Sequence, residues 1–185
     1  MTDRACVLDP LCLNTNTGAA WVRYISGDYE GAIAHCLHAI ELEAGFLPAH
    51  RLLAATKLQA GAAEESVRYL SSLPAFRHDV VTMAWLAHAV AVTGDRARAV
   101  GILCELDESS ASRYVSPYHC AIGWAGVGDR DTAFTLLSRA YEERDPSLMH
   151  VASDPRFAVL RSDARYARLA GCLALPVDAL ETPHV

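Results

Sequence analysis

The chain has 185 residues, of which 52% are hydrophobic and 21% are charged, and its formal net charge at pH 7 is −6. This composition is that of an ordinary soluble protein, and the 16 basic residues form no cluster of the kind that binds nucleic acid. No run of about 20 apolar residues is present, and the N-terminal residues lack the basic flank and apolar run of a signal peptide, so we expect a cytoplasmic location without a membrane segment.

A short pattern occurs four times along the chain. Its copies are SGDYEGAI at 26–33, AGAAEESV at 60–67, TGDRARAV at 93–100 and VGDRDTAF at 127–134. The glycines at positions 27, 61, 94 and 128 are 34, 33 and 34 residues apart. A small residue follows each glycine five positions later, namely Ala32, Ser66, Ala99 and Ala133. Such regular spacing indicates a repeated structural unit.

Each copy of the pattern predicts two helices joined by a tight turn. A glycine just past a helix can adopt the left-handed conformation that satisfies the last carbonyl groups. In three copies an aspartate follows the glycine and can cap the second helix: Asp28, Asp95 and Asp129. The small residue lets the second helix lie close to the first. Because one helix pair cannot bury its own apolar faces, neighbouring pairs are expected to stack.

This 34-residue period, with Gly-Asp turns and alanines at fixed offsets, resembles the tetratricopeptide repeat. The resemblance implies an all-α fold, a right-handed superhelical solenoid of antiparallel helix pairs with a C-terminal capping helix. We expect a single domain over 1–175 and a tail at 176–185. Its predicted parts are a partial repeat at 4–12, repeats at about 13–46, 47–79, 80–113 and 114–146, and a lid at 153–175.

The C-terminal third carries a more specific resemblance. The segments AYEERDPSL at 140–148 and DPRFAVLRSDARY at 154–166 resemble the end of tetratricopeptide regions in bacterial signalling proteins. There the repeats follow winged-helix regulators, nucleotide cyclases or protein kinases, whose effector activities do not carry over to these residues. In the predicted lid, Asp154 and Asp163 are candidate N-caps. The lid residues expected to cover the fourth repeat are Phe157, Leu160, Tyr166 and Leu169.

The resemblance also implies a binding surface, because the first helices of successive tetratricopeptide repeats line a concave groove. The matching positions predict a groove lined by Asn14, Thr17, Trp21, Tyr24, Arg51, His88, Tyr118 and Ile122. Trp, Tyr and Arg dominate the binding energy of many interfaces. We therefore expect a scaffold or regulatory module that binds a protein or peptide segment. The alternatives are a small-molecule sensor or carrier, and an enzyme built around His88, the one groove residue that titrates near neutrality.

Catalytic and metal-binding motifs are missing from the sequence. There is no G-x-S-x-G, phosphate loop or H-E-x-x-H, so we expect no catalytic residues and no cofactor. His35 and His38 share a helix face, but a zinc site needs three or four ligands, and we expect polar surface positions rather than a metal site. The six scattered cysteines fit reduced, packed thiols. The apolar N-terminal edge of the first repeat could pair with a second copy of the chain.

Overall fold

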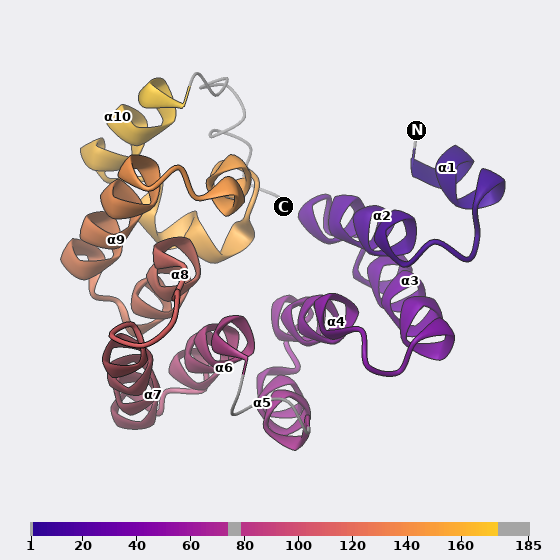
Figure 1. The fold of residues 1–185 in the computed structure, drawn as a ribbon, viewed down its shortest axis with the longest axis horizontal. Helices are drawn as coiled ribbons and strands as arrows, with labels where there is room; N and C mark the ends of the chain where they lie inside the picture. Colours follow the sequence, from indigo (N-terminus) through magenta and orange to yellow (C-terminus); the bar gives the residue numbers. More distant parts are fainter. Residues whose placement is uncertain (1, 74–78, 174–185) are drawn as a thin grey trace. The chain divides into compact units, whose positions relative to one another are not determined.

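The computed structural model describes residues 2–73 and 79–173. Within these ranges the fold is all-α, since every regular element is a helix and none is a strand. The chain divides into two compact units, Met1–Leu73 and Pro74–Val185. The first unit contains α1 to α5 and the second contains α6 to α10 (Figure 1). The boundary lies near the end of the second predicted repeat.

The first unit is a series of helices in which each one packs against the next. Its helices are α1 (Thr2–Leu8), α2 (Leu13–Ile25), α3 (Tyr29–Leu42), α4 (Leu47–Gln59) and α5 (Ala63–Ser72). The first helix of one pair also contacts the first helix of the next, α2 against α4. The interior between them is formed mainly by small and aliphatic side chains with one tyrosine, including Ala19, Ala20, Tyr24, Ala32, Cys36, Leu53 and Leu70.

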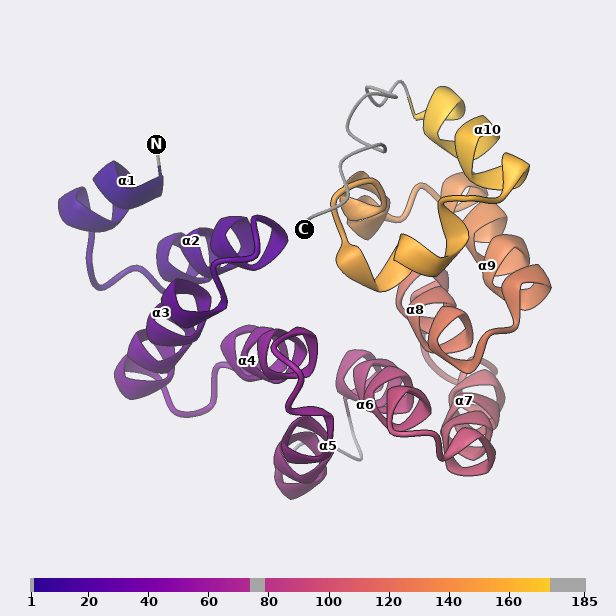
Figure 2. The ribbon, with the colours of Figure 1, turned by 180° about the vertical axis from the view of Figure 1, so that it is seen from behind.

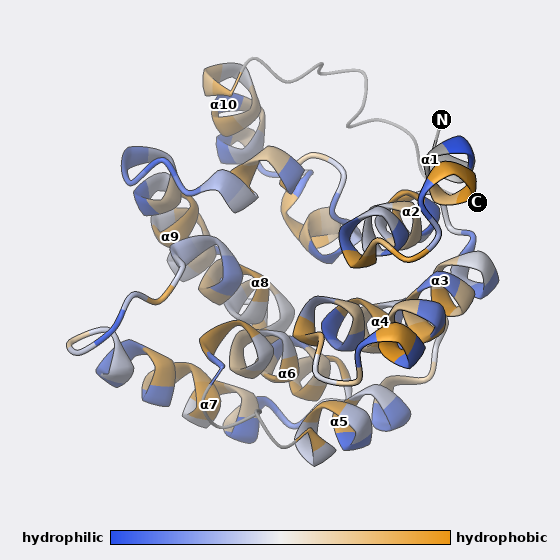
Figure 3. Cartoon of the chain, turned by 45° about the vertical axis from the view of Figure 1, so that its right-hand side comes forward, coloured by the Kyte–Doolittle hydropathy of each residue, from blue (hydrophilic) through white to orange (hydrophobic). Residues whose placement is uncertain are grey.

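The second unit continues this pattern and adds a cap. Its main helices are α6 (Val80–Val92), α7 (Arg96–Ser109), α8 (Pro117–Val127) and α9 (Arg130–Glu142). Helix α6 contacts both α7 and α8, and α8 contacts α7 and α9, so α8 lies at the centre of the unit. Helix α7, which follows α6, carries hydrophilic and hydrophobic residues along its whole length (Figure 3).

The turns between paired helices have the predicted backbone conformation. The four repeat glycines have φ angles of 81°, 90°, 93° and 84° at positions 27, 61, 94 and 128. In three of the turns the residue after the glycine donates its N–H to a carbonyl five positions earlier, as Asp129 does to Trp124. This is the Schellman arrangement, which ends a helix and satisfies its free carbonyl groups. The glycine prediction is confirmed.

The predicted caps and close helix contacts are also present. The carboxylates of Asp28, Asp95 and Asp129 each accept a hydrogen bond from the backbone N–H three residues later. The small residues at positions 32, 66, 99 and 133 are all buried, with at most 1% of their surface exposed. The hydroxyl of Ser66 donates to the carbonyl of Ala54 at 2.8 Å, so this contact joins α5 directly to the backbone of α4.

The C-terminal cap is more irregular than a single capping helix. It consists of two 3-10 helices, η2 (Pro146–His150) and η3 (Pro155–Leu160), followed by α10 (Ala164–Cys172). Each of the two 3-10 helices is preceded by an aspartate whose carboxylate accepts a hydrogen bond from the backbone N–H two residues later. A proline occupies the first position of each helix, where its fixed φ angle favours a tight turn. The segment between α9 and α10 runs beside α8 in both ribbon views (Figures 1 and 2). The predicted tail at 176–185 lies outside the described residues.

The cap closes the core of the second unit. Phe157 and Leu160 from η3 and Tyr166 from α10 are buried in one cluster with the apolar face of α8, and Leu169 packs against that cluster. The hydroxyl of Tyr166 donates to the carbonyl of Val151 at 2.7 Å, which joins α10 to the segment after η2. The residues predicted to cover the fourth helix pair therefore pack against it.

Candidate functional site

The residues of the predicted groove that belong to the first unit differ in exposure. On α2, Asn14 is exposed, Thr17 and Trp21 are half-buried, and Tyr24 is buried. The rings of Trp21 and Tyr24 lie 5.4 Å apart, so the tyrosine supports the tryptophan from inside the unit. Arg51 is half-buried on α4, which packs against α2. Tyr24 is thus a core residue, and the other four retain surface that a partner can reach.

The groove residues of the second unit lie in its interior. His88, Tyr118 and Ile122 are 5%, 1% and 0% exposed. Repeat positions alone predict an open face on the first helices, and therefore a surface position for all three. In the structure η3 covers that face of α8, and Gly126 allows the ring of His88 to lie against the α8 backbone. The assignment of these three side chains to a binding surface is corrected accordingly.

His88 is held neutral in this interior. One of its ring nitrogens, Nδ1, lies 3.0 Å from the carbonyl oxygen of Ile122. Burial, followed by the nearby charge of Arg156, lowers the pKa of His88 to about 4. A buried, neutral imidazole cannot contact a substrate at pH 7, so the predicted alternative of an enzyme built around His88 has no accessible base.

A buried ion pair fastens the cap to the rest of the second unit. The guanidinium of Arg156 donates to both carboxylate oxygens of Asp154, at 2.9 Å from Nε and 2.7 Å from Nη2. Tyr118 on α8 donates its hydroxyl to the same carboxylate at 3.0 Å. The guanidinium lies 3.7 Å from the ring centre of Trp85 on α6. Both charges are therefore compensated within the unit, and the group is structural.

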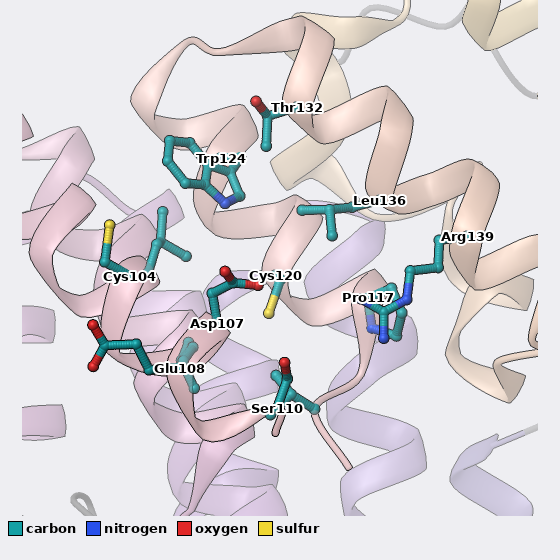
Figure 4. A pocket seen from close by; sticks show the side chains of 13 residues that line it. Cys104, Asp107, Glu108, Ser110, Pro117, Cys120, Trp124, Thr132, Leu136 and Arg139 are labelled. Carbon is teal, nitrogen blue, oxygen red and sulfur yellow. The ribbon is translucent and has the colours of Figure 1, made fainter. Parts of the chain in front are cut away.

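An open pocket lies between α7, α8 and α9, and we call it the α7–α9 trough (Figure 4). Its volume is about 390 Å³. It is lined by Leu103, Cys104, Leu106, Asp107, Glu108, Ser110, Val115, Pro117, Cys120, Trp124, Thr132, Leu136 and Arg139.

The trough follows from helical periodicity on three neighbouring helices. Helix α8 contributes Pro117, Cys120 and Trp124, which are spaced as i, i+3 and i+7 and so share one face. The lining residues of α7 and α9 follow similar spacings, and these two helices form the walls. In Figure 4 Asp107 of α7 and Leu136 and Arg139 of α9 point toward the space around Cys120 of α8, whereas the carboxylate of Glu108 points away from it.

The trough combines an apolar floor with charged walls. Leu103, Leu106 and Cys120 are buried in the floor, whereas Asp107 and Glu108 are exposed on the α7 wall. Burial raises the pKa of the Cys120 thiol to about 11, so it stays protonated and is a poor nucleophile at pH 7. The floor of the trough is therefore apolar, and its buried thiol carries no charge at pH 7.

Sequence reasoning missed the trough entirely, because its residues lie mostly on the second helices of the pairs. One available signal was the acidic pair Asp107 and Glu108 at the end of a helix, where acidic side chains are unfavourable.

The two histidines that share a helix face, His35 and His38, have hydrogen-bond partners within the first unit. His35 lies 3.4 Å from the side-chain oxygen of Asn16, and His38 lies 3.2 Å from the carbonyl of Pro10.

Two other kinds of feature are absent from the described residues. Residues 2–73 and 79–173 contain no group of three or more His, Cys, Asp or Glu side chains that could hold a metal ion. No helix in the same ranges is both long enough and apolar enough to cross a membrane. No family model, curated protein or solved structure matches the chain.

Proposed function

We propose that this chain is a tetratricopeptide-type interaction module that binds a segment of a partner protein. In this proposal its helix pairs stack into a right-handed superhelical solenoid. The support is the regular recurrence of one turn conformation and one buried small residue at intervals of 34, 33 and 34 residues, with an aspartate cap in three of the four copies. By the resemblance of its C-terminal third, the partner belongs to a bacterial regulatory system in the cytoplasm.

The observation that carries this proposal is the α7–α9 trough. It offers an apolar floor with accessible walls, which is the form of surface that accepts side chains of a bound segment. The floor includes Trp124, and tryptophan is among the residues that contribute most to binding energy. We therefore place the docking site for the partner segment here.

The first unit provides a second contact surface in this proposal. Asn14, Thr17 and Trp21 are spaced as i, i+3 and i+7 along α2, and all three keep exposed area. Arg51 on α4 adds a half-buried basic residue to this surface. These four residues are the part of the predicted concave groove that remains accessible.

The N-terminal edge of the first unit bears on the predicted homodimer. Val7, Leu8 and Leu11 have 80%, 77% and 69% of their surface exposed. Adjacent exposed apolar residues are typical of contact sites, so pairing with a second copy through this edge stays a prediction. Light scattering of the wild-type chain and a Leu8→Glu variant would test it, since the charge should shift a dimer toward monomer.

A small-molecule sensor or carrier is the second candidate function. The volume of the trough, about 390 Å³, lies within the range of about 300–1,000 Å³ that is typical of ligand pockets. Its few polar groups stand at the rim of an apolar floor, which is also usual for such pockets.

The test is affinity capture from the native host with a variant that fills the trough. Cys104 is exposed and lines the trough, so Cys104→Trp should block it without disturbing the core. Glu105→Trp, at the next position of α7, is the matched control, because Glu105 is exposed and does not line the trough. Eluates from the wild type and both variants would be compared by quantitative mass spectrometry.

The result expected is a protein retained by the wild type and by Glu105→Trp but lost with Cys104→Trp. Equal capture by all three chains would contradict docking in the trough. A small molecule that follows the same pattern, without a protein, would establish the sensor or carrier function instead.

A further inference from the structure

The floor of the α7–α9 trough fits an aliphatic chain. Leu103 and Leu106 are buried there and Trp124 is half-buried, so the surface offered to a ligand is apolar and aromatic. The protonated thiol of Cys120 adds no charge to this floor. A ligand group that lies on it needs methylene groups rather than polar atoms.

The α7 wall of the trough is negatively charged. Asp107 and Glu108 lie in the last turn of α7, where the helix dipole already places partial negative charge, and that turn has no basic residue. Neither carboxylate forms a salt bridge within residues 2–73 and 79–173. The two carboxylates therefore destabilise the end of their own helix. Conflicts of this kind are expected at functional sites.

The basic residue of the opposite wall is paired at the end of its own helix. Arg139 on α9 donates from Nε to Glu143 at 2.6 Å, so its charge is already compensated. In Figure 4 Arg139 lies on the other side of Cys120 from Glu108. Besides burial, the nearby charges act on the pKa of Cys120 in opposite directions, since Arg139 lowers it and Asp107 raises it. The two carboxylates thus lie on the α7 wall of the trough, and the guanidinium of the α9 wall is paired with Glu143.

Resting on the proposed function, we propose that the partner segment inserts a lysine or arginine side chain into the α7–α9 trough. The methylene stem lies along the apolar floor, and the cationic head meets the carboxylate of Asp107, with Glu108 of the same helix turn adding negative charge nearby. The indole of Trp124 adds a cation–π attraction for the same head. Long basic side chains have this combination of apolar stem and charged end, whereas an acidic side chain would be repelled.

The test measures retention of the full chain on immobilised hexapeptide sets that differ at one fixed central position. That position is lysine, arginine, norleucine or glutamate, and the remaining positions are mixed. We expect about tenfold tighter binding to the lysine and arginine sets than to the norleucine set. A difference of that size corresponds to the free energy that two exposed ion pairs contribute. In an Asp107→Asn, Glu108→Gln double variant this preference should disappear.

The matched control is a Glu64→Gln, Glu105→Gln double variant. It removes the same charge from exposed positions outside the trough, and its preference should equal that of the wild type. A preference that falls equally in both double variants would show that only the net charge of the chain matters, and would overturn the proposal. So would retention of all sets without preference, although binding of segments in general would then stand.

Two further results separate this proposal from the function on which it rests. If the wild type retains none of the four sets, the proposed segment binding fails together with this inference. If n-butylammonium alone gives a saturable change in tryptophan fluorescence that the Asp107→Asn, Glu108→Gln variant lacks, and no set is retained, the trough binds a small amine. That result overturns the assignment to a partner segment.

Discussion

Replacing Arg156 by methionine tests whether the buried ion pair holds the cap in place. Methionine keeps much of the length and apolar surface of arginine but removes a guanidinium whose side chain is only 2% exposed. The carboxylate of Asp154, which is fully buried, then keeps the Tyr118 hydroxyl and the backbone N–H of residue 156 as donors. Removing one member of a buried ion pair costs about 3–5 kcal/mol, because the other charge stays buried. We expect a loss of that size for the second unit.

A second variant separates the stranded charge from lost packing. In Arg156→Met, Asp154→Asn the remaining amide is neutral and still accepts hydrogen bonds, so it should recover about 1–3 kcal/mol of the loss. Urea unfolding of the full chain would be followed by tryptophan fluorescence in a Trp21→Phe background, since Trp85 and Trp124 both lie in the second unit. An unchanged midpoint for Arg156→Met, or a double variant less stable than the single one, would refute this reasoning.

Four further substitutions, one of them followed across a change of pH, address the glycines and His88. Gly126→Ala should destabilise the second unit by about 1–3 kcal/mol, since its Cβ would lie 2.5 Å from Nδ1 of His88. The matched control is Gly101→Ala, whose Cβ meets nothing within 4 Å and which should stabilise the unit by about 0.5–1 kcal/mol. Equal melting temperatures for the two variants would contradict the close packing of Gly126 against His88. The pKa of His88, about 4, is below its ordinary value, so the unfolded chain takes up the proton first and stability falls with pH below about 6.5. From pH 7 to 4.5 this contribution is about 2 kcal/mol, and a His88→Gln variant with the same pH slope as the wild type would refute it. Gly94→Val should cost about 1–3 kcal/mol because Gly94 has a φ of 93°, and an unchanged thermal midpoint would count against a strained turn.

The sequence alone was sufficient to predict structural features that depend only on residues adjacent in the chain. The left-handed turn at Gly128 and the cap at Asp129 follow from backbone conformation and one side-chain hydrogen bond, so their pattern identifies them. Burial of His88 and Tyr118 could not be predicted in the same way. It depends on where η3 packs, and the residues that bring it there, Asp154 and Arg156, lie far along the chain.

The trough was missed for a related reason. Its lining residues are unremarkable one by one, and they form a site only because α7 and α9 pack on either side of α8. The spacing of Pro117, Cys120 and Trp124 indicated that these residues share a face, but not that this face stays partly uncovered. That depends on the small contact residues that set the distances between helices.

Most of the packing contacts within each unit join helices that follow one another in the chain, such as α2 with α3 and α8 with α9, although α6 also packs against α8. Closing such short loops costs little conformational entropy, and chains rich in local contacts fold within microseconds to milliseconds. Each pair also carries its own turn and its own buried small residue. Gain or loss of one pair during evolution would therefore leave each remaining pair with its own turn and its own small residue, but a new neighbour would have to cover the apolar face that the lost pair had buried.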